Sequence, residues 1–430
     1  MLPISLALLV PNLNFIINNI FLGHLSEQAL ATASITGVYY LIFSAIGFGL
    51  NNGMQMLIAR RAGENRPEEI GNIFNQGVLI SLLLAAASIV ITYTLAPIIL
   101  KNVLHDKDTY HQAVSFLHIR IWGLPALYIY QMRNALLIGI NQSKLLIAGT
   151  LAEAIANVAF DYMLIFGKGP FPALGFNGAA YASVLAEVIG LVVIFVVINA
   201  KGIGRQYGLL KKLVWEREGA NRILKISSPL IFQLAISILS WWFFYLLVEH
   251  HGRTSLAVSN TMRNVFSFFG TFNWAFAATT STMVSNLIGQ GKQDDVLPVI
   301  RKIVRINAGI MLLVCLLLNL FPRAILSVYG QSEAFMQAGI PILRLAAFAM
   351  VIMSVGGVWL NAVTGTGNSK ITFRNELVAT LFYTIYVYLV LEVYNLSILW
   401  GWLSEIFYWS ILLILSFLYF RSGKWKTLVI

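Results

Sequence analysis

Three polar residues recur on one face of an otherwise apolar segment. Glu153, Asn157 and Asp161 follow one another at intervals of four residues within the stretch 145–166. This spacing places all three along a single face of a helix. A charged aspartate at the centre of a membrane-spanning helix costs roughly 2.5–3.5 kcal/mol on insertion scales, so it needs a proton, a cation or a basic partner. A carboxylate and an amide on one face therefore predict a site for a proton or a small cation, with Asp161 as its main ligand.

The composition predicts that this helix lies in a membrane. Of the 430 residues, 58% are apolar and only 11% are charged, and the mean hydropathy is +0.77. Soluble proteins are about half apolar and a quarter charged. The chain is therefore neither a soluble enzyme nor a disordered protein, and its basic excess of +11 is not gathered into a nucleic-acid-binding patch. We expect a polytopic membrane protein, with the bilayer and a small molecule as partners and no nucleic acid.

Twelve apolar stretches have about the 20 residues needed to cross the hydrocarbon core. The fold class that we predict is an all-α membrane protein with twelve transmembrane helices. The first stretch begins at Met1 without a basic flank, so it does not resemble a cleaved signal peptide; either the chain is trimmed there, or the first helix inserts almost without a flank. The predicted spans are 2–22, 35–58, 78–100, 116–139, 145–166, 178–197, 229–248, 265–287, 303–321, 340–360, 377–391 and 398–419.

The lysines and arginines predict the orientation. The loops after the even-numbered spans, together with the C-terminus, carry 20 of the 29 basic residues, and the opposite loops carry five. Basic residues concentrate in cytoplasmic loops. We therefore expect both termini in the cytoplasm and a multi-pass location in the plasma or inner membrane.

An internal repeat predicts the domain organisation. When the sequence is shifted by 226 residues, the polar stretch 59–69 falls on 285–295 and the turn 139–144 falls on 365–370. Such a shift indicates two parallel six-helix repeats related by an axis along the membrane normal, around a central cleft. The predicted parts are an N-terminal lobe, 1–200, a cytoplasmic linker, 201–225, and a C-terminal lobe, 226–430. We interpret the linker as a solvated tether near anionic lipid.

The motifs of the common enzyme and cofactor classes are absent from the sequence. There is no phosphate-binding GxxxxGK[ST] loop, no HExxH, CxxC or GxSxG motif, and the histidines lack metal-ligand spacing. We therefore expect no enzyme activity, no cofactor, and no metal beyond a possible Na⁺ at Asp161. Two six-helix repeats around a central cleft suggest a transporter that works by alternating access. Because no nucleotide-binding loop is present, we expect an ion gradient to be its energy source.

Other carboxylates fall within or near the spans. We interpret Glu249, Glu376 and Glu392 as interfacial residues or members of structural ion pairs, and Glu187 and Glu405 also lie in apolar stretches. The candidate basic partners are the arginines within or at the ends of spans: Arg120, Arg133, Arg263 and Arg344.

Five segments resemble the multidrug and toxic compound extrusion (MATE) family along nearly the full chain. They are 18–26 (NNIFLGHLS), 59–69 (ARRAGENRPEE), 133–139 (RNALLIG), 157–167 (NVAFDYMLIFG) and 173–183 (ALGFNGAAYAS). The resemblance implies twelve helices in two lobes around a cleft. It also implies export of amphipathic, often cationic molecules in exchange for H⁺ or Na⁺.

The resemblance also implies a cation site in the first lobe. Asn157 and Asp161 fall on the family's Asn–Asp pair, and Ser183 falls near its hydroxyl position. The family's acid in the first helix is replaced here by Asn18, which leaves one carboxylate fewer; Glu153, one turn before Asn157, is the candidate replacement. The family's acid in the seventh span has no counterpart before Glu249, so a second-lobe cation site of that type is not expected.

The substrate cleft is expected to involve polar and aromatic residues from both lobes. For each of them, helix packing is the alternative role. The candidates are Asn51, Gln55, Trp241, Asn273 and Tyr383. We predict a monomeric, cation-coupled antiporter. The alternative is a flippase for a lipid or a lipid-linked saccharide, which would favour a broad basic cavity, and a membrane-embedded enzyme is a third class.

Overall fold

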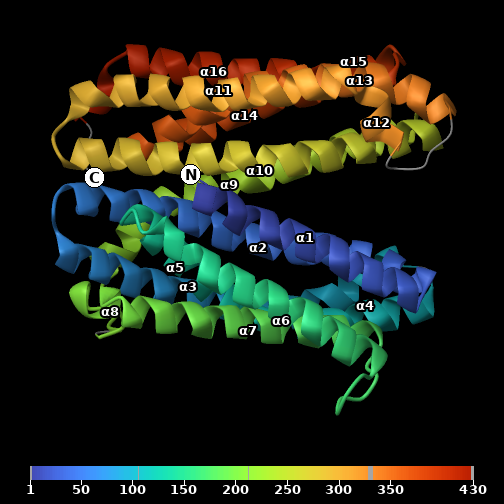
Figure 1. Ribbon diagram of the computed structural model, residues 1–430, viewed down its shortest axis with the longest axis horizontal. Helices are drawn as coiled ribbons and strands as arrows, with labels where there is room; N and C mark the ends of the chain where they lie inside the picture. The colour runs from blue at the N-terminus through green and yellow to red at the C-terminus, as the bar shows by residue number, and fades with distance from the viewer. Residues whose placement is uncertain (1, 105, 212, 328–332, 428–430) are drawn as a thin grey trace. The chain divides into compact units, whose positions relative to one another are not determined.

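The computed structural model describes residues 2–104, 106–211, 213–327 and 333–427, apart from the side chains at 2, 3, 6–9, 11–16, 27, 30, 31, 103 and 253. Throughout these residues the regular structure is helical. The chain divides into two units, Leu2–Ser227 and Ser228–Ile430, here called the N-terminal and the C-terminal unit. Within each unit the long helices run side by side along a common direction (Figure 1).

The N-terminal unit consists of long helices joined by short turns. Ser26 begins the second helix, because its side chain accepts a hydrogen bond from the N–H of Ala29, and Pro67 begins the third. Gly167, with φ +68°, ends the sixth in the left-handed conformation. The elements are α1 (Leu2–Leu25), α2 (Glu27–Gly63), α3 (Pro67–Val103), α4 (Lys107–Arg120), η1 (Ile121–Gly123), α5 (Leu124–Gly139), η2 (Ser143–Leu145), α6 (Leu146–Phe166), α7 (Phe176–Ala200) and α8 (Ile203–Gln206).

Helix α9 (Arg217–Glu249) starts in the N-terminal unit and continues into the C-terminal unit. The C-terminal unit buries a core of aliphatic and aromatic side chains that includes Phe244, Met350, Tyr383 and Trp402. Its further elements are α10 (Arg253–Gly289), η3 (Gln293–Asp295), α11 (Val296–Leu320), α12 (Pro322–Ser327), α13 (Glu333–Thr366), α14 (Ser369–Tyr388), η4 (Leu389–Val393), α15 (Ile398–Trp402), α16 (Ser404–Arg421) and η5 (Lys424–Thr427).

Several element boundaries recur at the spacing seen in the sequence. Helices α2 and α10 each have 37 residues, and both their first and their last residues are 226 positions apart. The start of α3 at Pro67 corresponds in the same way to η3 at Gln293, and η2 at Ser143 corresponds to α14 at Ser369. The helix-breaking turns therefore occupy equivalent places in the two halves of the sequence. The symmetry axis relating the halves stays a prediction.

The helical, membrane-spanning character of the chain is confirmed, whereas the count of twelve spans stays a prediction. Within the described residues, nine helices are long and apolar enough to cross a membrane. The three predicted spans outside this set lie on α1, on α4–α5 and on α10. The turn at Ile121–Gly123 divides the fourth span and leaves α5 only 16 residues long. Helix α10 is rich in serine, threonine and asparagine, which lowers its hydropathy.

The predicted linker, 201–225, belongs to the N-terminal unit and is held against α3 instead of forming a solvated tether. The side chain of Asn75 accepts a hydrogen bond from the N–H of Leu210 at 2.8 Å. Gln76 donates to the carbonyl of Val214 at 2.6 Å and accepts from the N–H of Glu216 at 3.1 Å. These side chains satisfy backbone groups that have no helical partner. At Gly71 a Cβ atom would lie 1.7 Å from the carbonyl oxygen of Tyr207, so only glycine allows this close approach.

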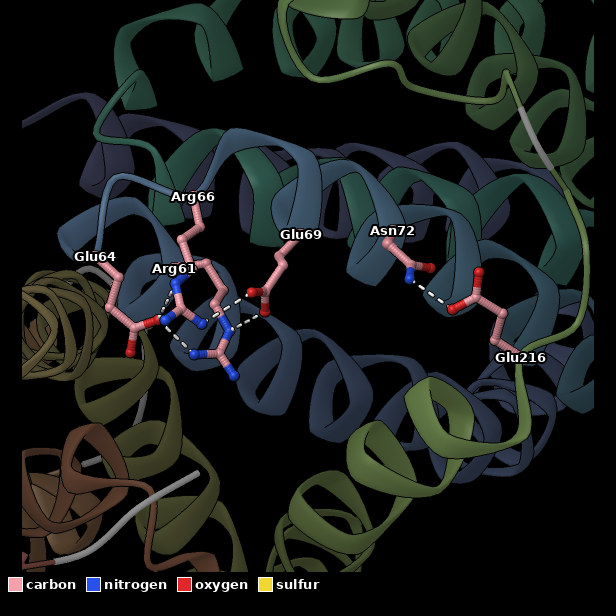
Figure 2. A network of polar contacts seen from close by, with 6 residues as sticks. All are labelled: Arg61, Glu64, Arg66, Glu69, Asn72 and Glu216. Atoms are coloured by element: carbon pink, nitrogen blue, oxygen red, sulfur yellow. Dashed lines mark hydrogen bonds and ion pairs between the residues drawn. The ribbon is translucent and has the colours of Figure 1, made fainter.

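Two groups of polar contacts lie along this part of α3, one with Glu216 of the segment 201–225 and one at the turn between α2 and α3 (Figure 2). Asn72 donates to the carboxylate of Glu216 at 2.7 Å. Arg61, which is buried, forms ion pairs with Glu64 and, at 2.8 Å, with Glu69. Exposed Arg66 pairs with Glu69 at 3.0 Å. The polar motif 59–69 therefore ties the ends of α2 and α3 together.

Candidate functional site

Helix α6 carries a buried carboxylate that has no hydrogen-bond partner. Asp161 has no exposed surface, and neither of its carboxylate oxygens is hydrogen-bonded to any residue that the structure describes. A buried polar group without a partner costs about 1–3 kcal/mol, and more when it is charged. Asp161 is therefore costly in its charged form, and its role as a cation ligand stays a prediction.

Helices α6 and α7 pack closely where α6 carries the residues that precede Asp161. A Cβ atom at Gly190 would lie 2.8 Å from the Cβ of Glu153 and 3.3 Å from the carbonyl oxygen of Gly149. One turn further along this interface, the amide of Asn157 lies 3.4 Å from the hydroxyl of Ser183. The structure thus brings three predicted site residues, Glu153, Asn157 and Ser183, to one helix interface.

Asn18 lies at the height of Asp161, with an unpaired oxygen. Its Oδ1 atom is buried and has no partner among the described residues. Three residues later on α1, the ring of Phe21 packs against Tyr162 and Phe166 of α6, with centroids 6.4 and 6.0 Å apart. Since three residues make about one helical turn, Asn18 is level with the turn that contains Asp161. The two side chains are not hydrogen-bonded to each other.

An ion pair lies one turn beyond Ser183 on α7. Arg120, at the end of α4, binds both carboxylate oxygens of Glu187, at 2.5 and 3.0 Å. Tyr40 donates to Glu187 at 3.3 Å, and its ring stacks on the Arg120 guanidinium at 3.8 Å. A Cβ atom at Gly123 would collide with both members of the pair, so η1 leaves the room that they occupy. The sequence suggests Arg120 as a partner but does not assign the pair to the site.

A second buried arginine lies near Glu153. Arg133 is fully buried, its guanidinium is 3.6 Å from the centroid of Tyr130, and neither of its terminal nitrogens has a hydrogen-bond partner in the described part of the chain. The charged neighbours of Glu153 are Glu187, Arg133 and Arg120. Glu153 forms no ion pair within 4 Å with any described residue. Three carboxylates, Glu153, Asp161 and Glu187, therefore lie on α6 and α7, and Arg120 and Arg133 are the charged neighbours of the opposite sign.

The two cleft candidates of the N-terminal unit are buried in α2. Asn51 donates to Asn52 at 3.4 Å, while its own Oδ1 has no partner in the described ranges. Gln55 is almost fully buried. In this unit taken by itself, both residues lie within the protein interior.

The three cleft candidates of the C-terminal unit are packed into its core. Asn273 is buried and accepts a hydrogen bond from Asn307 at 2.7 Å. Tyr383 is buried, with its ring 5.8 Å from that of Tyr408. Trp241 is half-buried and packs edge-on against Trp402 at 6.4 Å. Within the C-terminal unit these contacts are those of helix packing.

Two glutamates of the C-terminal unit are buried against neutral partners. The interfacial or ion-paired role expected for Glu376 is wrong, because this residue is only 1% exposed and accepts hydrogen bonds from the Tyr408 hydroxyl and, at 3.2 Å, from Gln233. Glu405 is also buried and accepts from the indole of Trp409 at 3.2 Å. Glu392 is exposed, and its carboxylate lies 3.0 Å from Nδ1 of His250.

Comparison with known proteins identifies the family. Residues 3–163 and residues 229–389 each match the family model described as MatE. These two ranges cover most of the chain and begin 226 residues apart. The chain belongs to the MATE family.

Curated relatives of this MATE chain have similar length and low identity. It is 22% identical over 417 residues to a protein of Thermotoga maritima described as probable multidrug resistance protein NorM, covering 94% of this chain and 87% of that one. A protein of Synechocystis sp. with the same description is 25% identical over 357 residues, which cover 78% and 74% of the two chains.

Solved structures share the fold of this MATE chain. A crystal structure of MATE in complex with MaL6 superposes with a TM-score of 0.90 at 18% identity, covering 99% of this chain and 96% of that one. An outward-facing conformation of a multidrug resistance MATE family transporter gives 0.88 at 19% identity, covering 99% and 95%. The resemblance to the family is thereby confirmed, and the chain is a multi-pass membrane protein with the MATE fold.

The chemistry available to this family member differs between its buried acids. Glu187 is neutralised by Arg120, whereas Asp161 lies in a carboxylate–amide–hydroxyl series without a bonded base. Hard oxygen ligands of this kind suit protons and alkali cations more than soft metals. No group of three or more His, Cys, Asp or Glu residues with metal-binding geometry occurs in the described ranges.

Proposed function

We propose that the chain is a cation-coupled efflux transporter that exports amphipathic, cationic organic compounds in exchange for H⁺ or Na⁺. The observation that carries this proposal is the burial of Asp161 with both carboxylate oxygens unpaired. An ion from a gradient is the ligand that this carboxylate lacks. The names of its relatives, multidrug resistance proteins, support efflux as the direction of transport.

In this proposal Asp161 loads the cation, and the oxygens of Asn157, Ser183 and Asn18 surround it. Glu153 lies about two turns before Asp161 on α6 and supplies a second negative charge on the same face of this helix. Amide and hydroxyl oxygens bind an alkali cation without adding charge. Asn18 in place of an acid weakens the negative field, which suits a single monovalent ion.

The transport cycle that we propose is alternating access between two six-helix lobes, 1–200 and 226–430, joined by the linker 201–225. The recurrence of helix ends at 226 residues supports two equivalent sets of six spans. The distribution of basic residues supports cytoplasmic termini in a plasma or inner membrane. Cation loading at Asp161 then favours one orientation of the lobes, and substrate is released in the other.

The flippase alternative is not favoured. The two curated relatives described above carry the name of multidrug resistance proteins, and the matched family model covers both halves. A pyrophosphate-bearing lipid would need basic side chains that remain available to it. Arg120 is occupied by Glu187, and the guanidinium of Arg133 is fully buried in the N-terminal unit.

Transport by the purified protein in proteoliposomes tests this proposal. With an imposed H⁺ or Na⁺ gradient, we expect uptake of cationic dyes into inside-out vesicles, and we expect Asp161→Asn to abolish it. Asp108→Asn is the matched control, because Asp108 is an exposed aspartate of the same unit. Size-exclusion chromatography establishes that both variants fold. Gradient-driven transport by Asp161→Asn at the wild-type rate would overturn the assignment.

A further inference from the structure

Helix α11 carries all of its charge near one end and on one side. Its only charged residues are Arg301, Lys302 and Arg305, and all three are exposed. The opposite face of the helix is buried in the C-terminal unit and includes Ile303 and Asn307. None of the three cations forms an ion pair with a described residue. They therefore lie on the outer face of α11 within its own unit.

The same face of α11 continues into exposed leucines. Leu312, Leu316 and Leu320 follow the cations at helical spacing, and each is more than half exposed. From Arg301 to Leu320 the helix rises about 29 Å at 1.5 Å per residue, close to the ~30 Å thickness of the hydrocarbon core. When the leucines face the acyl chains, the cations consequently lie at the depth of the phosphate groups of one leaflet.

A glycine leaves the helix surface bare between the cations and the leucines. Gly309 is exposed one turn after Arg305, and a Cβ atom there would meet no atom within 4 Å. Arg301 and Arg305 are themselves one turn apart, at a spacing where like charges repel each other. An anion between them removes this repulsion, and guanidinium groups match the geometry of phosphate oxygens. The bare surface at Gly309 leaves room for the group attached to such a phosphate.

The carboxylates around α11 do not supply the missing negative charge. Just before the helix, Asp294 pairs with Lys426 at 2.9 Å, and Asp295 forms no ion pair with a described residue. Helices α10 and α13 pack against α11, and α10 contains no acidic residue. The only acid of α13 is Glu333, which pairs with Arg323 beyond the other end of α11. Among the described residues, the three cations therefore have no counter-charge in contact.

The equivalent face of the N-terminal unit is covered by the protein itself. Asn75 and Gln76 of α3 lie 226 positions before Arg301 and Lys302. Both are buried, and both hold the backbone of the segment 210–216 by hydrogen bonds. Positions that hold a chain segment in one unit are thus cationic and exposed in the other.

We propose that Arg301, Lys302 and Arg305 bind the phosphate of an anionic membrane phospholipid, whose acyl chains lie along the exposed leucines of α11. The lipid covers on this unit the positions that the segment 210–216 covers on the other. The proposal concerns recognition of the surrounding bilayer. It depends neither on the transported compound nor on the coupling ion.

Native mass spectrometry of the purified full chain tests this site. The protein is released from detergent micelles that contain phosphatidylglycerol or phosphatidylcholine, and the bound lipid is counted. We expect phosphatidylglycerol to bind more tightly, and we expect Arg301→Gln combined with Arg305→Gln to weaken its binding roughly thirtyfold. Lys292→Gln combined with Lys424→Gln is the matched control, because it removes two positive charges from exposed residues outside the α-helices.

Further variants separate the lipid contact from general charge, and size-exclusion chromatography checks that each one folds. Arg301→Lys combined with Arg305→Lys keeps both charges and is expected to retain most of the binding. Gly309→Leu also keeps every charge, but it is expected to weaken binding because it fills the bare surface. Glycerol phosphate, a headgroup without acyl chains, is expected not to compete.

Four results would each overturn the proposal. The first is binding of phosphatidylcholine as tight as that of phosphatidylglycerol. The second is an equal loss of binding in the control and in the Arg301→Gln, Arg305→Gln protein. The third is wild-type binding by a folded Gly309→Leu protein, and the fourth is displacement of the lipid by glycerol phosphate, which would make the occupant a soluble anion. Because the readout is lipid binding, these results are separate from failure of the transport proposal.

Discussion

In the N-terminal unit Glu187 is buried against the guanidinium of Arg120, whereas in the C-terminal unit Glu376 is buried against a phenol and an amide. The first arrangement is electrically neutral in itself and needs no ion. The second, like Asp161 in the N-terminal unit, has no basic partner and carries a net charge whenever its carboxyl group is ionised. The comparison teaches that the presence or absence of a basic partner, and not burial alone, decides whether a buried acid is neutralised within the protein.

The largest expected effect comes from breaking the ion pair. Arg120→Met leaves Glu187 buried without its counter-charge, which costs about 3–5 kcal/mol of stability. Thermal unfolding in detergent measures the loss. Adding Glu187→Gln to Arg120→Met is expected to recover most of it, because the orphaned charge is gone. An Arg120→Met protein as stable as the wild type would show that the pair is not structural.

A smaller loss is expected when the neutral donor to Glu376 is removed. Tyr408→Phe takes away a hydrogen bond to a buried carboxylate, which is worth about 1.5–3 kcal/mol. Tyr386→Phe is the matched control, because that hydroxyl bonds to the carbonyl of Trp400 in an exposed position. Equal unfolding temperatures for the two variants would contradict a charged Glu376 in the folded protein.

The helix interface that aligns the N-terminal site is tested by adding one methyl group. Gly190→Ala places a Cβ atom 2.8 Å from the Cβ of Glu153, and overpacking of this kind costs about 1–3 kcal/mol. Gly37→Ala in α2 meets no atom within 4 Å and is expected to stabilise its helix by about 0.5–1 kcal/mol. Opposite signs in thermal unfolding confirm the close contact, whereas a stabilised Gly190→Ala protein would refute it.

The smallest effects are expected at exposed ion pairs in the two units. Arg66→Ala removes the pair with Glu69, and Lys426→Ala removes the pair with Asp294 at 2.9 Å. Exposed pairs contribute about 0–1 kcal/mol and are screened by salt. Both variants should unfold within a degree or two of the wild type, with any difference reduced at high salt. A large loss in either variant would place these pairs among the structural ones.

The features that repeat along one helix could be predicted from the sequence. The four-residue spacing of Glu153, Asn157 and Asp161 predicts their common face, and it is this face that meets α7 through Gly190. The family resemblance correctly places Ser183 beside Asn157. Both inferences depend on local geometry, which periodicity reveals directly.

The remaining features depend on contacts between distant segments. Arg120 and Glu187 are 67 residues apart, and their pairing requires the turn at Gly123, which no periodic pattern indicates. Glu376 appeared interfacial because the apolar stretch begins at Leu377. The helix itself begins at Ser369, two turns earlier, and this places Glu376 well inside it. Polar residues at the start of a helix hide its true length from hydropathy.

The hydrogen bonds between the connecting segment and α3 limit how far that segment can extend. A free connector of 25 residues would have a root-mean-square span of about 25–30 Å. Here hydrogen bonds to Asn75 and Gln76 hold Leu210, Val214 and Glu216 against α3, and α9 begins at the residue after Glu216. The position at which α9 begins, within the N-terminal unit, is thereby fixed by α3.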